Sequence, residues 1–164
     1  MLVIVLNGPI NSGKTTTGRA LASLLANARF IDGDDHGAPD ATPFDQMLEI
    51  AFACLEHEIA AATCQVLIIA YPLREMDYRR LGIAVSARSA KLIVVSLNLP
   101  PDIALANRGE RILRADEIER SRQMYQEGYG TRAFSDLIVT DMTTPLETAS
   151  RILGHFGLHA WQGS

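Results

Sequence analysis

The chain alternates between short continuous apolar runs and longer segments in which apolar residues recur every three or four positions. Continuous runs of this length are typical of strands buried on both faces, as in a parallel sheet. The runs are residues 2–6, 29–32, 65–70, 91–97 and 136–140. Five strands alternating with helices predict an α/β fold: a three-layer, doubly wound, five-stranded parallel sheet.

The periodic segments predict the helices between those strands. They cover residues 15–28, 41–64, 74–90, a short stretch after Pro101, 116–127 and a last segment from 145. In the second helix Thr42 is the expected cap, and Met47, Leu48, Ala51, Leu55, Ile59 and Ala62 are the expected buried stripe. In the last helix Thr144 and Glu147 form a capping box around Pro145, and Leu146 begins the core face.

One loop between the first strand and the first helix carries a phosphate-binding pattern. Residues 8–15, GPINSGKT, match G-x-x-x-x-G-K-[ST] without a mismatch and lie between an apolar run and an amphipathic segment. Such a loop turns successive backbone N–H groups and a helix N-terminus toward one anion. Lys14 adds a charge toward the β- and γ-phosphates, and Thr15 offers a hydroxyl to Mg²⁺. The candidate nucleotide-binding residues here are Gly8, Asn11, Ser12, Gly13, Lys14, Thr15 and Thr16.

A pair of aspartates follows the second strand in the stretch IDGDDHG. Ligands of parallel sheets bind beyond the carboxyl ends of the strands, so Asp32 and Asp34 are expected beside the phosphate loop. Asp32, with Thr15, is the candidate Mg²⁺ ligand, and Asp34 is the candidate group that orients or deprotonates an acceptor hydroxyl. The alternative is a solvated acidic turn, in which Asp-Gly is common. The third strand ends in AYPLR without an acid, and the guanine-reading N-K-x-D pattern is missing, which disfavours motor and switch NTPases.

Length, charge and cysteine content limit the classes of protein to which the chain can belong. A chain of 164 residues fits one domain, residues 1–164, and its formal charge of −4 argues against a broad nucleic-acid surface. No apolar run reaches membrane-spanning length, and the start has no basic segment typical of a signal peptide. Cys54 and Cys64 lack metal-type spacing and are expected to be buried free thiols. These features predict a cytoplasmic protein with no membrane partner, either a monomer or a homodimer.

The motifs together resemble the small-molecule kinases related to nucleoside-monophosphate kinases: shikimate kinase, gluconate kinase, adenylylsulfate kinase and chloramphenicol phosphotransferase. The resembling stretches are GPINSGKTTTGRALA, FIDGDDHG, YPLREMDYRRL, NRGERILR and SRQMYQEGYGTRAFSDLIVTD. The resemblance implies a P-loop NTPase fold that uses ATP and Mg²⁺ to phosphorylate a hydroxyl of a metabolite or antibiotic. It also implies a small lid at about 109–115, an acceptor region at about 33–63, and adenine held between Arg108 and the loop 141–145, which includes Pro145.

The remaining candidates concern the lid and the acceptor. Arg108 and Arg111 are expected to fold over the transferring phosphoryl group, with Arg111 as the catalytic one; the alternative is a solvated charged helix. The acceptor candidates, beside Asp34, are His36, Arg74 and Arg122. Shikimate kinase has its substrate-binding arginine four residues before a tyrosine, where this chain has Ser121 between Arg120 and Arg122, so which of the two faces the substrate stays open. Two other functions remain: a nucleoside or nucleotide kinase of the same fold, and a non-catalytic ATP-binding regulator.

Overall fold

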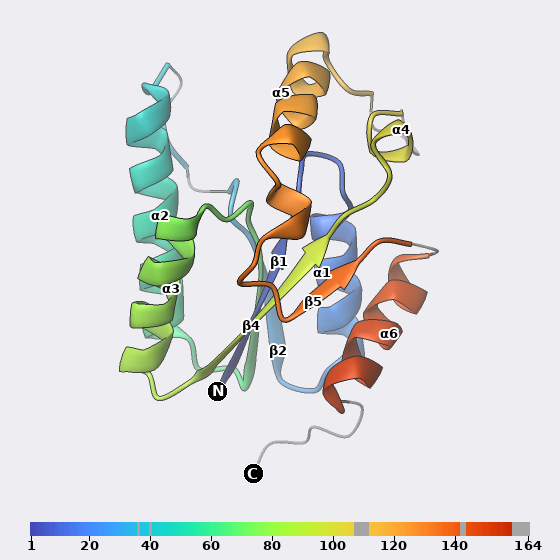
Figure 1. Ribbon diagram of the computed structural model, residues 1–164. Helices are drawn as coiled ribbons and strands as arrows, with labels where there is room; N and C mark the ends of the chain where they lie inside the picture. Colours follow the sequence, from blue (N-terminus) through green and yellow to red (C-terminus); the bar gives the residue numbers. More distant parts are fainter. Residues whose placement is uncertain (36, 40, 107–111, 142–143, 159–164) are drawn as a thin grey trace.

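Five parallel strands form one twisted sheet in the order β2-β3-β1-β4-β5 (Figure 1). The computed structural model describes residues 1–35, 37–39, 41–106, 112–141 and 144–158. The strands are β1 (Leu2–Asn7), β2 (Ala28–Asp32), β3 (Val66–Ala70), β4 (Lys91–Leu97) and β5 (Leu137–Val139). The expected doubly wound parallel sheet is therefore confirmed. Because β1 lies in the middle, the loop that follows it emerges at the centre of the carboxyl edge.

Helices cover both faces of this sheet. They are α1 (Lys14–Leu24), α2 (Phe44–Ala61), α3 (Glu75–Ala87), α4 (Pro101–Ala104), α5 (Ala115–Gln126) and α6 (Pro145–Phe156), with a 3₁₀ turn η1 (Tyr129–Thr131). Figure 1 shows α2 and α3 on one side of the sheet, α1 and α6 on the other, and α5 beyond the carboxyl ends of the strands. No helix among the described residues has both the length and the apolar character needed to cross a bilayer.

The sheet buries alternate residues against the two helical layers. Ile4 and Ile68 belong to the core shared with α1 and α6, whereas Val5 and Ile69 belong to the core shared with α2 and α3. All six residues of β1 are buried, which is why the sequence reads as a continuous apolar run rather than an alternating one.

Most helix ends lie close to their expected positions, and the capping box of Thr144 and Glu147 is present, with the Glu147 amide donating to Thr144 Oγ1 at 3.2 Å. Three local expectations were wrong. Thr42 does not cap α2; Pro43 occupies that position and the Thr42 hydroxyl donates to the carbonyl of Pro39 at 2.7 Å. The first helix ends at Leu24 rather than at residue 28, so Ala28 starts β2. Leu146 is 55% exposed, because Thr148 takes the buried position of that turn.

Helix α2 divides its apolar stripe between two environments. Phe52, Leu55 and Ile59 are buried in the core, whereas Met47 and Leu48 are only half-buried and line a cavity. The expected core stripe was therefore wrong in its first turns, where the helix rises past the sheet (Figure 1). The two cysteines are free, as expected, but half-buried rather than buried.

Candidate active site

The loop after β1 has the backbone that its glycines predict. Gly8 has φ 145° and Gly13 has φ 92°, both in the region that favours glycine. A Cβ at Gly8 would lie 2.5 Å from the carbonyl oxygen of Leu97, so β4 leaves no room for a side chain there. Asn11 also has a positive φ, and its side-chain amide donates to the carbonyl of Ala104 at 2.8 Å, which fixes the loop against α4.

Lys14 curls back over this loop at the first turn of α1. Its ammonium donates to the carbonyls of Gly8 at 3.0 Å and Pro9 at 2.7 Å. Lys14, Thr15 and Thr16 all line the cavity described below. The fully buried hydroxyl of Ser12 has no hydrogen-bond partner within the part of the chain that the structure describes. A buried polar atom of this kind normally has a partner, and a bound anion would add acceptors beside it.

Thr15 and Asp32, the two candidate Mg²⁺ ligands, lie within hydrogen-bond distance of each other. Thr15 Oγ1 donates to Asp32 Oδ2 at 2.7 Å, joining the start of α1 to the end of β2. Asp32 Oδ1 also accepts from the backbone N–H of Asp34 at 3.3 Å, so one carboxylate organises the turn that presents the second. A hydroxyl and a carboxylate oxygen are hard ligands of the type that Mg²⁺ prefers, with phosphate and water oxygens completing its shell. The residues present therefore fit the cation that the resemblance implies.

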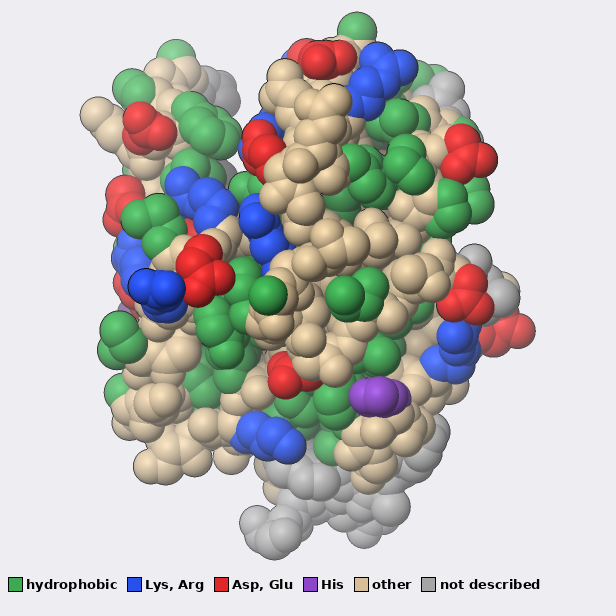
Figure 2. Space-filling model, in the orientation of Figure 1, with side chains coloured by type: hydrophobic (Ala, Val, Ile, Leu, Met, Phe, Trp, Pro, Cys, Tyr) green, Lys and Arg blue, Asp and Glu red, His purple; other side chains and the backbone are tan. Residues whose placement is uncertain are grey.

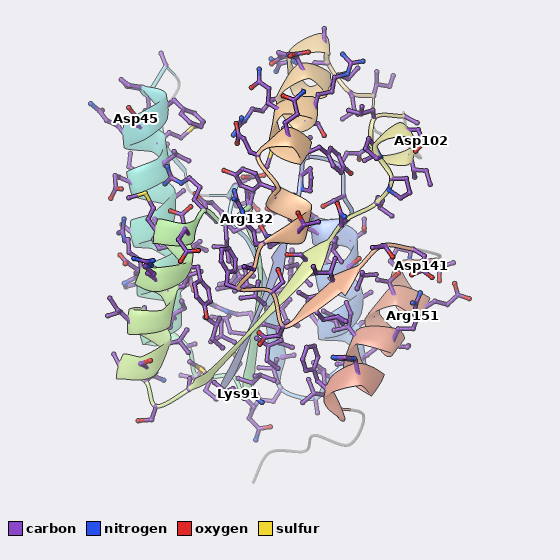
Figure 3. All side chains as sticks on the ribbon, in the orientation of Figure 1. Asp45, Lys91, Asp102, Arg132, Asp141 and Arg151 are labelled. Carbon is purple, nitrogen blue, oxygen red and sulfur yellow. The ribbon has the colours of Figure 1, made fainter. Side chains whose placement is uncertain are left out.

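A cavity of about 870 Å³ runs from the phosphate loop toward α2 and α5. Figure 2 shows the hollow between these two helices at the carboxyl edge of the sheet. Asp34 lies exposed on its wall, and Pro145 lines the cavity as well, at the start of α6. Asp141 holds the loop before Pro145 to α6 through two hydrogen bonds of 3.1 Å from Arg151, as Figure 3 shows.

Arg74 reaches the cavity in a closed ion pair. Its Nε and one terminal nitrogen donate to the two carboxylate oxygens of Asp77 at 2.8 and 2.9 Å, and the Asp77 side chain is only 3% exposed. The bond to Asp77 raises the pKa of Arg74 further above its usual value. Tyr71, on the same wall, has its pKa raised to about 12, first by burial and then by the negative charge of Asp77.

On α5 the inward arginine is Arg120. It lines the cavity and donates to Glu127 at 2.8 and 3.3 Å, whereas Arg122 is exposed, pairs with Glu119 at 3.6 Å and is not among the lining residues. The open choice between the two arginines is thus answered by placement: the structure brings Arg120, not Arg122, to the cavity. The contact that Ser121 makes with the phosphate loop determines which side of α5 faces the cavity.

Ser121 is fully buried and its hydroxyl donates to the carbonyl of Ile10 in the phosphate loop at 3.2 Å. Ser121 therefore forms a contact between α5 and the loop. Tyr125, four residues on, donates from its hydroxyl to the carbonyl of Leu99 at 2.7 Å and fastens α5 to the segment after β4.

Neither the protein-family models nor the curated protein sequences gave a match. Among solved structures, a gluconokinase from Sinorhizobium meliloti 1021 is similar with a TM-score of 0.67 and 14% identity over 97% of both chains. A tunicamycin resistance protein from Deinococcus radiodurans gives 0.62 and 18% over 96% of both. Shikimate kinase from Aquifex aeolicus gives 0.61 and 19% over 99% of this chain and 100% of that one.

The chain has the fold of the P-loop small-molecule kinases. In this P-loop kinase fold the residues brought together at the cavity are Lys14, Thr15, Asp32, Asp34 and Arg74. Three other expected residues, His36, Arg108 and Arg111, lie outside the described residues, as do residues 109–111 of the expected lid.

The sequence analysis missed several groups that shape this site. Asn7, at the end of β1, is fully buried; its side chain donates to Ser96 Oγ at 2.8 Å and to the carbonyl of Tyr129 at 2.7 Å, and accepts from the Leu73 amide at 2.8 Å. A polar residue directly after five apolar ones was the available signal. Asp77 carried a signal too, three residues after Arg74 on the same helix face.

Proposed function

We propose that the chain is an ATP- and Mg²⁺-dependent kinase that transfers the γ-phosphoryl group to a hydroxyl of a small molecule. The observation that carries the proposal is the Thr15–Asp32 contact at 2.7 Å beside Lys14, with Asp34 on the same cavity wall. A cation-binding pair, a phosphate-facing ammonium and a second carboxylate are the groups that phosphoryl transfer to an alcohol requires.

Each residue has a role in this proposal. Lys14 neutralises charge that develops on the β- and γ-phosphate oxygens. Thr15 and Asp32 would hold Mg²⁺, which supplies further neutralisation when bound. Asp34 accepts the proton of the acceptor hydroxyl while the oxygen of that hydroxyl forms a bond to the γ-phosphorus. The bond from the γ-phosphorus to the bridging oxygen breaks at the same time, and its electron pair leaves with ADP.

The fold likeness supports this proposal without deciding the acceptor. The similar solved structures are a gluconokinase, a shikimate kinase and a tunicamycin resistance protein. Their names refer to a sugar acid, a cyclic hydroxy acid and an antibiotic, so the shared fold does not specify one acceptor. A nucleoside or nucleotide kinase, or an ATP-binding regulator without transfer, would place the same loop around ATP. Transfer to an alcohol is what separates the proposal from the regulator.

The test uses the two lysines of the chain, Lys14 and Lys91. Lys91 is exposed at the opposite, amino end of the sheet, as Figure 3 shows, and so offers a matched control. ADP release with ATP, Mg²⁺ and a library of hydroxyl compounds should fall at least 10²-fold in Lys14→Ala, on the order expected when a charge-stabilising group is lost. Lys91→Ala should match the wild type. An unchanged Lys14→Ala, or ATP binding with no transfer to any compound, would contradict the proposal.

A further inference from the structure

The wall of the cavity beyond the phosphate loop is mainly apolar. Helix α2, the segment after β3, helix α5 and the turn η1 each contribute to it. The residues that matter are Phe44, Met47, Leu48, Tyr71, Met124 and Tyr129. Phe44 is 61% exposed at the first turn of α2, while Met124 and Tyr129 are buried deeper in the wall. Apolar surface of this extent favours a ligand that carries apolar surface of its own.

The charges on this wall do not favour an anion. Its two arginines, Arg74 and Arg120, are each bonded to a carboxylate by two or more hydrogen bonds. Each guanidinium keeps its charge and its N–H donors, but the pair that it forms with its carboxylate has no net charge. Asp32, Asp34 and Glu117 also line the cavity, so among the described lining residues beyond the loop two arginines face five carboxylates.

The environment of Tyr71 agrees with this charge balance. Burial and then Asp77 raise its pKa most, Arg74 lowers it by less, and Asp34 raises it by a smaller amount still. An anion placed beside Tyr71 would meet the same burial and the same carboxylates. The anion would also have to compete with the carboxylates that Arg74 and Arg120 already bind. One of these carboxylates, Asp77, is nearly inaccessible to solvent.

We propose that the acceptor is an uncharged or cationic amphipathic alcohol with an apolar body, rather than a carboxylate or a phosphate ester. The apolar body packs between α2 and α5 against Met47 and Met124, and its polar groups accept from the outer nitrogens of the paired arginines. The hydroxyl points toward Asp34 and the phosphate loop. This inference rests on the proposed function, because it names the acceptor class of that same site. Among the alternative acceptors of the same fold, this proposal favours a nucleoside over a nucleoside monophosphate.

The first experiment measures binding without ATP, so that it can fail independently of phosphoryl transfer. Nile red, a neutral apolar dye, is titrated into the protein and its fluorescence is followed. Met47→Glu places a charge on the cavity wall, and Ile50→Glu makes the same change on α2 at a residue that does not line the cavity. We expect at least a tenfold loss of affinity in Met47→Glu and less than a twofold change in Ile50→Glu. No binding, or binding that Met47→Glu leaves unchanged, would overturn the proposal.

The second experiment isolates the charge. Methyl 4-(hydroxymethyl)benzoate and 4-(hydroxymethyl)benzoate share a ring and a hydroxyl and differ by one negative charge. The ester should displace Nile red at a concentration at least tenfold lower than the acid. Glu127→Gln removes the charged partner of Arg120 and should reduce the ratio of the acid and ester concentrations that displace Nile red. Glu119→Gln removes the partner of the outward Arg122 and should leave that ratio unchanged. An ester that fails to compete, an acid that competes equally well, or a preference that Glu127→Gln leaves unchanged overturns the inference, even where Lys14-dependent transfer is found.

Discussion

Asn7 ties four parts of the site together, so its replacement by alanine is the sharpest test of the architecture. Its three hydrogen bonds, of 2.7 to 2.8 Å, connect β1 to β4, to the segment before α3 and to η1. Alanine removes all three. Ser96 keeps a partner in Ser135 at 2.6 Å, but the amide of Leu73 and the carbonyl of Tyr129 lose theirs in a buried environment.

Each orphaned buried polar group costs about 1–3 kcal/mol, so two of them lower the free energy of unfolding by about 4 kcal/mol. For a chain of this size that corresponds to a fall in Tm of roughly 8–16 °C. Circular dichroism during urea and thermal unfolding measures both quantities. Gln46→Ala, at an exposed position of α2, is the control and should shift Tm by little. A loss below about 1 kcal/mol for Asn7→Ala would show that these bonds do not hold the site's walls together.

Four further substitutions test other parts of the molecule. Asp32→Asn should weaken the Mg²⁺ dependence of ADP release together with ATP use, whereas Asp34→Asn should spare ATP binding and lower kcat by roughly 10²-fold or more; equal losses of ATP binding would refute this division. The pKa of the Tyr71 hydroxyl is raised from 10.0 to about 12, so its contribution to the free energy of unfolding is complete below pH 10 and is lost between pH 10 and 12. Denaturant unfolding across this pH range should show a smaller loss of stability in Tyr71→Phe than in the wild type. The same pH profile in both proteins would contradict the shift. Arg80 bonds two glutamates of α2 and lies 4.5 Å from the ring centroid of Phe52, so Arg80→Ala should lower the free energy of unfolding by about 1–2 kcal/mol in chemical denaturation, and no change would mean that solvent screens these contacts.

The phosphate loop shows why part of this site was predictable from the sequence. A buried strand, a glycine turn and a helix start are local features, and residues 2–15 contain them all. The contact of Thr15 with Asp32 needed one further rule, that adjacent parallel strands end at the same edge of a sheet. The bounds of β4, residues 91–97, were also predicted to the residue, because its apolar residues follow Lys91 and stop before Asn98 and the two prolines at 100 and 101.

The phase of α5 was not predictable in that way. Arg120 and Arg122 differ by two positions, which places them about 200° apart around a helix. Which of them faces inward depends on the contact of Ser121 with the loop carbonyl of Ile10, a contact between residues far apart in sequence. In retrospect the spacing of Glu117, Arg120 and Met124 marks one helix face that includes Ser121. The small Ser121 at the centre of that face lets α5 approach the phosphate loop closely enough for its hydroxyl to reach the carbonyl of Ile10.

The division of α2 between core and cavity follows from lengths alone. Its 18 residues span about 27 Å at 1.5 Å per residue, whereas the five residues of β3 span roughly 17 Å. About 10 Å of helix, close to two turns, must therefore extend beyond the strand it packs against. On those two turns Phe44, Met47, Leu48 and Ala51 line the cavity, and Ala51 is also the first residue of α2 that is buried in the core. The periodicity of the sequence is the same in both halves, so hydrophobic pattern by itself assigns all of it to the core. Comparing helix length with strand length separates the residues that bury the sheet from those that meet the ligand.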